Sequence, residues 1–238
     1  MDKVVVLTGA GISAESGVPT FRGEAGLWRT YRPEDLATPS AFRRDPALVW
    51  EWYNWRRELV ARCEPNAAHR TLVEMERHIE DFVLITQNVD GLHQRAGSRR
   101  VLELHGSLWR MRCTVEDRVV EDHQVPLPSI PPRCPCGALM RPDVVWFGES
   151  LPSEVLSAAH DAVRRCRLLL VVGTSGVVYP AAALPQLAHH AGARVVEFNV
   201  ERTPISAYAD EVILGPAAVA LPRWWAAFIS AAKSLTAT

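Results

Sequence analysis

Residues 4–14 read Val-Val-Val-Leu-Thr-Gly-Ala-Gly-Ile-Ser-Ala, and this stretch decides the fold. An apolar run that ends in a glycine-rich turn is typical of a buried strand leading into a helix. Gly9-Ala10-Gly11-Ile12-Ser13-Ala14 satisfies the loose dinucleotide pattern G-x-G-x-x-G/A, in which glycines let the backbone approach a pyrophosphate. The alternative is a tight turn without a ligand, and the motif alone does not separate the two.

Further apolar runs alternate with helical patterns along the chain. The apolar runs cover 82–85, 168–172, 195–198 and 212–214, and the helical patterns cover 66–78, 153–165 and 181–191, with Asn66 and Ser153 as predicted N-caps. Continuous apolar runs suit strands that are buried on both faces. The alternation therefore predicts an α/β fold, a parallel sheet covered by helices.

Two stretches interrupt this alternation. Residues 22–63 contain three prolines and a tryptophan-rich helical pattern over 47–62, and residues 107–142 are polar, proline-rich and hold three of the five cysteines. We expect both to be insertions that form a smaller lobe. The chain would then be one domain, 1–238, with a large lobe over about 1–24, 65–106 and 143–238 and a small lobe over about 25–64 and 107–142.

The composition narrows the class of protein. The 238 residues are 48% hydrophobic and 22% charged with a net charge of -1, as in ordinary globular proteins, and they provide no basic field for nucleic acid. No run approaches the roughly 18 apolar residues of a membrane span. The N-terminus resembles no secretory leader, and five cysteines make no disulfide framework. We expect a cytoplasmic monomer without nucleic-acid or membrane partners.

Polar clusters follow three of the predicted strands, and in open parallel sheets ligands bind at this end. The clusters are Thr86-Gln87-Asn88-Val89-Asp90, Gly173-Thr174-Ser175 and Asn199-Val200-Glu201. Helix capping explains one such cluster, but three of them beside the glycine loop favour a binding cleft. A hydride-transferring oxidoreductase needs an acidic residue at the end of a second strand, about 20 residues after the glycine loop, to hold the ribose. In this chain that region has no strand pattern. Asn199 and Glu201 are better candidates for a ribose or adenine contact, which suggests other chemistry.

His105 is the histidine best placed for catalysis. It lies in Glu103-Leu104-His105-Gly106-Ser107, after a short strand-like run and at the junction with an insertion. A lone histidine is more often structural, but one that titrates near neutrality suits a general base. The other helical histidines suit packing or surface positions.

Taken together, these motifs resemble the sirtuin family from Val4 to about Pro222. The stretches that carry the resemblance are GAGISAESGVPTFRG (9–23), TQNVDGLH (86–93), ELHG (103–106), RPDVVWFGE (141–149), GTS (173–175) and FNVE (198–201). The resemblance implies a Rossmann-like parallel sheet with helices on both faces, a smaller lobe with a helical module and a zinc-ribbon-like module, and NAD and an acyl-lysine peptide bound between the lobes.

The resemblance also implies roles for individual residues. The ADP portion of NAD would contact Ala10, Gly11, Thr174, Ser175, Asn199 and Glu201, and the cofactor would also contact Gly9, Gly173 and Val200. The nicotinamide riboside would contact Phe21, Arg22, Gln87, Asn88 and Asp90. The acyl-lysine and its peptide backbone would lie against Val144, Trp146, Phe147 and Glu149.

The implied reaction consumes NAD. The acyl oxygen attacks the ribose C1′, nicotinamide leaves with Asn88 and Asp90 gripping its carboxamide, and His105 acts as general base on the ribose hydroxyls, so that free lysine and O-acyl-ADP-ribose are released. The alternatives are a hydride-transferring oxidoreductase, a mono-ADP-ribosyltransferase and a non-catalytic NAD-sensing module. His105, Asn88 and Asp90 together argue against a sensor, which needs no base.

The tryptophan-rich helical pattern over 47–62 indicates which acyl group the protein would remove. Tyr53 and Arg56 are three positions apart and share a helix face, and they match a carboxylate better than a neutral acetyl group. The alternative is a solvated face beside a buried Trp50/Trp55 stripe. The resemblance favours recognition, because the demalonylase and desuccinylase branch of sirtuins has Tyr-x-x-Arg here, with an alanine matched by Ala37. Thr20 replaces the Asp that is usual in deacetylases, and some activity on acetyl-lysine is also expected.

The resemblance implies a structural zinc held by two cysteine pairs, but the ligand set is incomplete. Cys113 is present, Glu116 stands where its partner cysteine is expected, and the second pair is shortened to Cys134-Pro135-Cys136. Glu116, Asp117 or His123 would complete four ligands. The alternative is a lobe that folds without metal. Cys63 and Cys166 suit packing positions.

Overall fold

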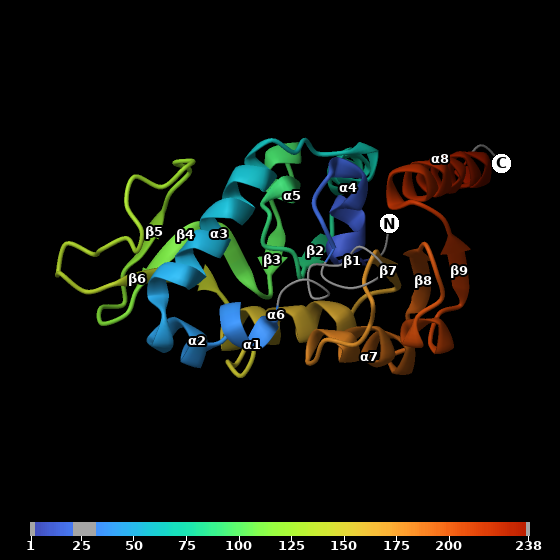
Figure 1. The fold of residues 1–238 in the computed structure, drawn as a ribbon. Helices are drawn as coiled ribbons and strands as arrows, with labels where there is room; N and C mark the ends of the chain where they lie inside the picture. Colours follow the sequence, from blue (N-terminus) through green and yellow to red (C-terminus); the bar gives the residue numbers. More distant parts are fainter. Residues whose placement is uncertain (1–2, 21–31, 237–238) are drawn as a thin grey trace.

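Six parallel strands form the central sheet, in the order β3-β2-β1-β7-β8-β9 (Figure 1). The computed structural model describes residues 3–20 and 32–236. The strands are β1 (Val4–Thr8), β2 (Phe82–Thr86), β3 (Val101–Glu103), β7 (Leu168–Val172), β8 (Arg194–Asn199) and β9 (Glu211–Leu214). The apolar runs in the sequence therefore predicted five of these six strands to within one residue at their ends, whereas β3 was indicated only by the short strand-like run before His105.

The register of the sheet follows from its apolar runs. Val4 pairs with Phe82 on one side of β1 and with Leu168 on the other. Every residue of β1 and β7 is buried, because helices cover both faces of the sheet. All five of the strand pairings are parallel, so the strands end at the same edge.

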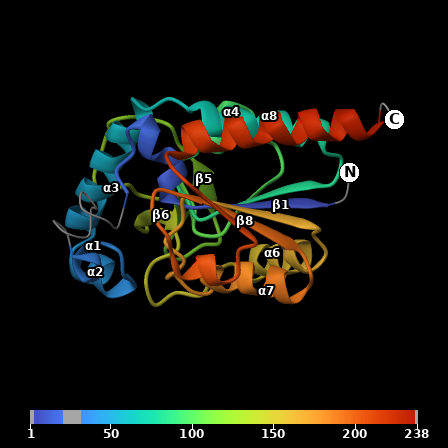
Figure 2. The same ribbon diagram turned by 90° about the vertical axis from the view of Figure 1, so that its right-hand side faces the viewer.

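Helices pack on both faces of this sheet (Figure 2). Helices α4 (Ala67–His78) and α8 (Ala217–Thr236) cover one face through a core that includes Leu72 and Leu221. Helices α6 (Ser153–Arg164) and α7 (Leu184–His190) cover the other face through Val163 and Leu184. This arrangement confirms the predicted α/β fold.

A second sheet lies beside the first, with antiparallel strands in the order β5-β4-β6 (Figure 1). Its strands are β4 (Gly106–Cys113), β5 (Val119–Glu121) and β6 (Met140–Val144). Three helices from the first predicted insertion pack near it: α1 (Pro33–Leu36), α2 (Pro39–Arg44) and α3 (Pro46–Ala61). The Trp50 indole N–H of α3 donates to the Met140 carbonyl at 2.8 Å, and both residues lie in one buried apolar core.

Two helix predictions need correction. Ser153 is the first residue of α6 rather than its N-cap, because Pro152 occupies the cap position and contributes no side-chain hydrogen bond. The pattern over 181–191 is a 3₁₀ turn, Ala181–Ala183, followed by α7, since Pro185 has no N–H and suits only the first turn of a helix. Asn66 is confirmed as the N-cap of α4, where it accepts N–H bonds from Ala68 and His69.

The remaining described helix of α type is α5 (Leu92–Ala96), which follows the polar cluster after β2. Within the ranges 3–20 and 32–236, no helix combines the length and the apolar character that crossing a membrane requires.

Candidate active site and metal centre

A cleft of about 590 Å³ lies where the parallel strands end and the second sheet begins. Gly9 follows β1, Gln87 follows β2, Gly173 follows β7, and Asn199 ends β8. The cleft brings together these predicted residues: Gly9, Ala10, Gly11, Ala37, Tyr53, Arg56, Gln87, Asn88, His105, Val144, Trp146, Phe147, Glu149, Gly173, Thr174, Ser175, Asn199, Val200 and Glu201. Phe21 and Arg22 lie outside the described residues.

Two glycine-containing turns form the floor of this cleft. The N–H of Gly11 donates to the Gly173 carbonyl at 2.8 Å, and a Cβ built on Gly11 would lie 2.7 Å from the Gly173 Cα. Gly173 has a φ of +63°, a conformation that favours glycine. The close approach of the two backbones leaves space for a ligand above them. The cradle, with Thr174 and Asn199 at its rim, fits the phosphates and ribose of a dinucleotide.

His105 lies in the same cleft with one ring nitrogen occupied. Its Nδ1 is 2.9 Å from the Gln87 carbonyl oxygen, which only accepts hydrogen bonds. The proton of the neutral ring therefore resides on Nδ1, and Nε2 carries a lone pair. Burial lowers the pKa of His105 below its ordinary value of 6.5, while the hydrogen bond to Gln87 opposes this shift. The neutral imidazole, which is the form that accepts a proton, predominates at pH 7.

The pH dependence of turnover should reflect this histidine. Because protonated His105 accepts no further proton, kcat should fall as the pH decreases, and the lowered pKa places this fall below pH 6.5 with a plateau at neutral pH. Measuring kcat from pH 5 to 8, with NAD and peptide at saturating concentrations, gives the midpoint of this acid limb of the profile. A midpoint above pH 6.5 would contradict the assignment, as would an unchanged acid limb in the residual activity of His105→Ala.

Asn88 and Asp90 differ in their access to the cleft. Asn88 lines it and donates from Nδ2 to the Gly9 carbonyl at 3.0 Å. Asp90 is only 4% exposed and is not among the described lining residues. Its carboxylate accepts the Ser13 hydroxyl at 2.8 Å and the Leu92 N–H at 2.9 Å. Burial raises the pKa of Asp90, and these two hydrogen bonds oppose the rise.

A buried polar network behind Asn88 was not predicted from the sequence. The Ser13 Oγ lies 3.3 Å from Asn88 Nδ2 and 3.4 Å from His69 Nε2, and His93 Nε2 lies 2.9 Å from the Thr8 hydroxyl. Burial lowers the pKa of His69 to about 4 and that of His93 well below 6.5, so both rings are neutral. Ser13 and His93 belong to the quoted motifs at 9–23 and 86–93, which are a usable signal, but His69 is an ordinary helix position in the sequence.

The other end of the cleft carries a buried cation. Arg56 is 6% exposed, and its Cζ lies 5.0 Å from the Trp52 ring centroid. Burial lowers the pKa of Arg56, while Tyr53 and Asp90 raise it, and a guanidinium stays protonated in proteins. Ala37 and Tyr53 are also buried and line the cleft. This end therefore offers a positive charge and a hydroxyl in a small, largely apolar space.

The alternative interpretation of this helix, a solvated charged face, is wrong. Arg56 and Arg57 are both buried, whereas Trp55 is 38% exposed and only Trp50 belongs to the buried stripe. Arg57 is held by Asp122, with Nη2 2.6 Å from Oδ1. Of these two buried arginines, Arg57 pairs with Asp122, and Arg56 is the one that lines the cleft.

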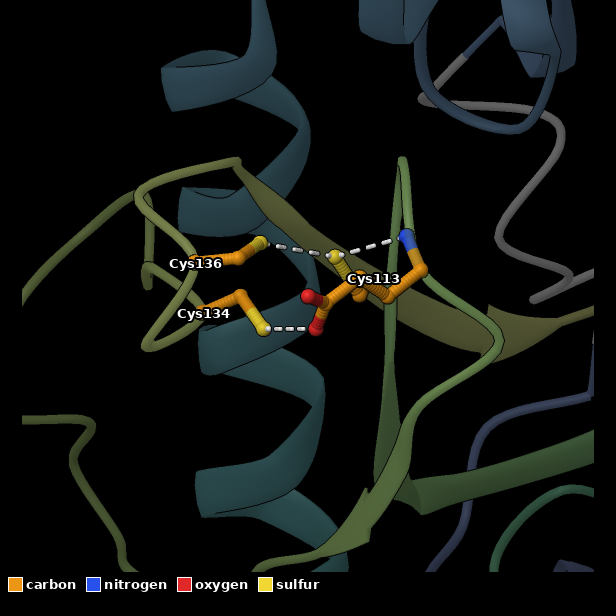
Figure 3. A group of neighbouring side chains, drawn as sticks. Cys113, Cys134 and Cys136 are labelled. Atoms are coloured by element: carbon orange, nitrogen blue, oxygen red, sulfur yellow. Dashed lines mark hydrogen bonds between the residues drawn. The ribbon is translucent and has the colours of Figure 1, made fainter.

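Three cysteines from two segments converge in the second sheet (Figure 3). Cys113 Sγ lies 3.6 Å from Cys136 Sγ, and Cys134 Sγ lies 3.6 Å from a Glu116 carboxylate oxygen. The four ligand atoms lie within 4.8 Å of one another. Zinc bonds thiolate sulfur at about 2.3 Å, which places two sulfurs of one tetrahedron roughly 3.8 Å apart. The donor set fits a structural zinc ion.

Glu116 is the residue that completes this group of four. Asp117 is not part of it, and His123 Nε2 lies 2.8 Å from Glu121 while its ring stacks on Trp109. The Cys113 sulfur accepts N–H bonds from Glu116 and Val115, which lower the pKa of its thiol and favour the thiolate that zinc binds. Cys63 and Cys166 are buried elsewhere, and burial raises the pKa of both thiols.

We expect the purified protein to contain zinc in a 1:1 ratio, as this donor set requires. Cys134→Ser should abolish the bound zinc, and Glu116→Gln should weaken it by roughly 10- to 100-fold, the loss typical of a disturbed zinc site. Elemental analysis and competition with a chromogenic chelator measure both effects. Asp117→Asn, at the adjacent acid outside the group, is the matched control. Equal zinc retention in Cys134→Ser and the unchanged protein would contradict the site.

Comparison with known proteins agrees with this geometry. The Sir2 family model matches residues 9–180. A protein of Aquifex aeolicus (strain VF5) described as an NAD-dependent protein deacylase is 58% identical over 208 residues, 87% of each chain. A solved complex of a Sir2 homologue with NAD has a TM-score of 0.90 at 48% identity, over 96% of this chain and 90% of that one. A Sir2 complex with a deacetylated p53 peptide and 3′-O-acetyl ADP-ribose has a TM-score of 0.79 at 35% identity, over 91% and 89%.

Proposed function

Because this chain belongs to the Sir2 family, it is an NAD-dependent protein deacylase, and we propose that it prefers lysine acyl groups that end in a carboxylate, such as succinyl and malonyl. The observation that carries the proposal is the placement of buried Arg56 and Tyr53 in the same cleft as His105 and Asn88. The guanidinium of Arg56 would attract and hydrogen-bond the terminal carboxylate of a succinyl or malonyl group.

The size and charge of this end of the cleft support the preference. Ala37 has the smallest side chain that keeps a Cβ, so the pocket beside it has room for an acyl chain longer than acetyl. The planar guanidinium of Arg56 suits bidentate contact with a carboxylate, and the Tyr53 hydroxyl adds a donor. Acetyl-lysine would use neither donor and would be a poorer substrate.

The residues around the glycine cradle would hold the co-substrate. NAD supplies an electrophilic ribose carbon and a nicotinamide leaving group. Gly11, Thr174 and Asn199 would bind its ADP portion, and Asn88 would orient the carboxamide. His105, with its Nε2 lone pair, would accept a proton from a ribose hydroxyl so that this hydroxyl becomes the nucleophile. With the consumption of one water molecule, which is needed to free the amine, the reaction would release nicotinamide, free lysine and O-acyl-ADP-ribose.

An acylated peptide would lie along residues 144–149. The backbone N–H groups of Trp146 and Phe147 donate to Glu149 Oε2 and to the Ala37 carbonyl, both at 2.9 Å, so a peptide that pairs with this segment would meet its carbonyl oxygens. The segment leaves β6 after Val144 and ends in a turn in which the Glu149 N–H donates to the Trp146 carbonyl at 3.0 Å. Acylated proteins or peptides are therefore the proposed partners.

Nicotinamide release tests this proposal. The protein is incubated with NAD and three peptides of one sequence whose lysine carries an acetyl, malonyl or succinyl group, and kcat/KM is determined for each. We expect a higher kcat/KM for both acidic acyl groups than for acetyl. Equal values for the three peptides, or a preference for acetyl, would contradict the proposed selectivity while leaving the deacylase activity standing.

A further inference from the structure

Tyr53 is held at the acyl end of the cleft by an indole from a distant part of the chain. The Trp146 Nε1 lies 3.0 Å from the Tyr53 hydroxyl oxygen, and both side chains are buried. An indole N–H only donates, so the Tyr53 oxygen must be the acceptor of this bond. The Tyr53 O–H proton is then directed away from Trp146.

The hydroxyl proton remains available to a ligand. Burial raises the pKa of Tyr53 above 10.0, so the hydroxyl keeps its proton at neutral pH. Within the part of the chain that the structure describes, no side chain or carbonyl accepts this proton, and Tyr53 lines the cleft. A hydroxyl that accepts from one side and has a free proton on the other acts as a fixed donor into the acyl pocket.

The indole itself is fixed by an ion pair. The Arg141 guanidinium makes two bonds to Glu149, at 2.6 and 2.9 Å, and its Cζ lies 3.6 Å from the Trp146 ring centroid. Glu149 Oε2 also accepts the Trp146 backbone N–H at 2.9 Å. The ring centroid of Phe42 lies 5.3 Å from that of Trp146. The indole therefore has little freedom to rotate away from Tyr53.

We propose that Trp146 is a positioning residue for acyl selectivity: its indole N–H holds the Tyr53 hydroxyl so that the O–H donates to the carboxylate of an acidic acyl group. This proposal rests on the proposed preference for such groups and assigns Trp146 a role beyond contact with the peptide backbone. A neutral acetyl group ends in a methyl group, which accepts no hydrogen bond from this hydroxyl. The effect of Trp146 should therefore appear in the ratio of kcat/KM for succinyl to that for acetyl peptide, mainly through the KM of the succinyl peptide.

A double-mutant cycle tests the proposal. Trp146→Phe keeps an aromatic ring but removes the N–H, and it should lower the succinyl-to-acetyl ratio about fivefold, as expected for one hydrogen bond. Tyr53→Phe should lower the ratio by at least as much. In the Tyr53→Phe background, Trp146→Phe should have no further effect on the ratio, because Trp146 acts through the hydroxyl. Additive effects of the two substitutions, or an unchanged ratio in Trp146→Phe, would overturn the proposal.

A closer isostere covers the possibility that Trp146→Phe unfolds the pocket. Site-specific incorporation of β-(3-benzothienyl)alanine at position 146 replaces the indole N–H by sulfur and keeps the shape of the ring. It should lower the ratio as Trp146→Phe does while leaving the midpoint of thermal unfolding within a few degrees. An unchanged ratio in this variant overturns the role of the N–H. Arg56→Met separates the role of Trp146 from the proposed preference for acidic acyl groups. If Arg56→Met abolishes this preference and the isostere at position 146 leaves it unchanged, only the role of Trp146 is wrong. If the unsubstituted protein shows no preference for acidic acyl groups, both proposals are wrong.

Discussion

Replacing His105 by alanine should lower kcat for deacylation by about 10²- to 10⁴-fold, the usual contribution of a general base. The Nδ1–H of His105 is held by the Gln87 carbonyl, so the lost group is a correctly oriented Nε2 base. The glycine cradle at Gly11 and Gly173 is formed by backbone contacts that the substitution leaves in place. We therefore expect the Kd for NAD to change little. Single-turnover kinetics and calorimetric titration with NAD measure the two quantities.

His190→Ala is the matched control, because His190 is exposed on α7 and is not among the residues that line the cleft. It should leave kcat and NAD binding unchanged. A His105→Ala protein that deacylates at more than a tenth of the original rate would exclude His105 as the general base. A His105→Ala protein that no longer binds NAD would indicate a structural role instead.

Arg56→Met should remove most of the preference for acidic acyl groups. A hydrogen bond to a charged group contributes about 1.5–3 kcal/mol, which corresponds to a roughly 10- to 150-fold loss in kcat/KM for succinyl peptide relative to acetyl peptide. Methionine fills a similar volume and lacks the charge, so the packing against Trp52 is largely retained. Parallel assays of nicotinamide release with the matched peptides give the ratio.

Two further substitutions make this result specific. Arg56→Lys keeps a positive charge but loses the planar fork, and it should retain an intermediate preference. Arg43→Met removes an exposed arginine of the neighbouring helix α2 and should change nothing. If Arg56→Met kept the full preference for succinyl over acetyl, the assignment of the acyl pocket to Tyr53 and Arg56 would be wrong.

The inner strands of the central sheet could be predicted from the sequence because they are buried on both faces. Such strands read as continuous apolar runs, as in Val4–Thr8 and Leu168–Val172, whereas the edge strand β3 (Val101–Glu103) is only half-buried. The small sheet gave no such signal: β6 (Met140–Val144) alternates buried and half-buried positions and contains a proline and two charged residues. Its pairing with β4 depends on contacts between distant segments.

The residues of the candidate site also fall into those that the sequence could locate and those that it could not. His105, Asn88 and Glu201 could be located because they follow strands whose ends meet at one edge of the sheet. The bond between Trp146 and Tyr53 joins positions 93 residues apart, and neither residue carries a local signal of it. The enclosure of Asp90 by Ser13 likewise appears only when the loop and the strand end are brought together. Partners of this kind are fixed by tertiary packing, which local patterns do not encode.

Identification of the products formed from NAD and a succinyl-lysine peptide tests the central claim most directly. Mass spectrometry at several time points should detect nicotinamide, unmodified peptide and O-succinyl-ADP-ribose in equal amounts. Formation of NADH, of ADP-ribose attached to protein, or of free peptide without consumption of NAD would contradict a deacylation in which NAD is a reactant.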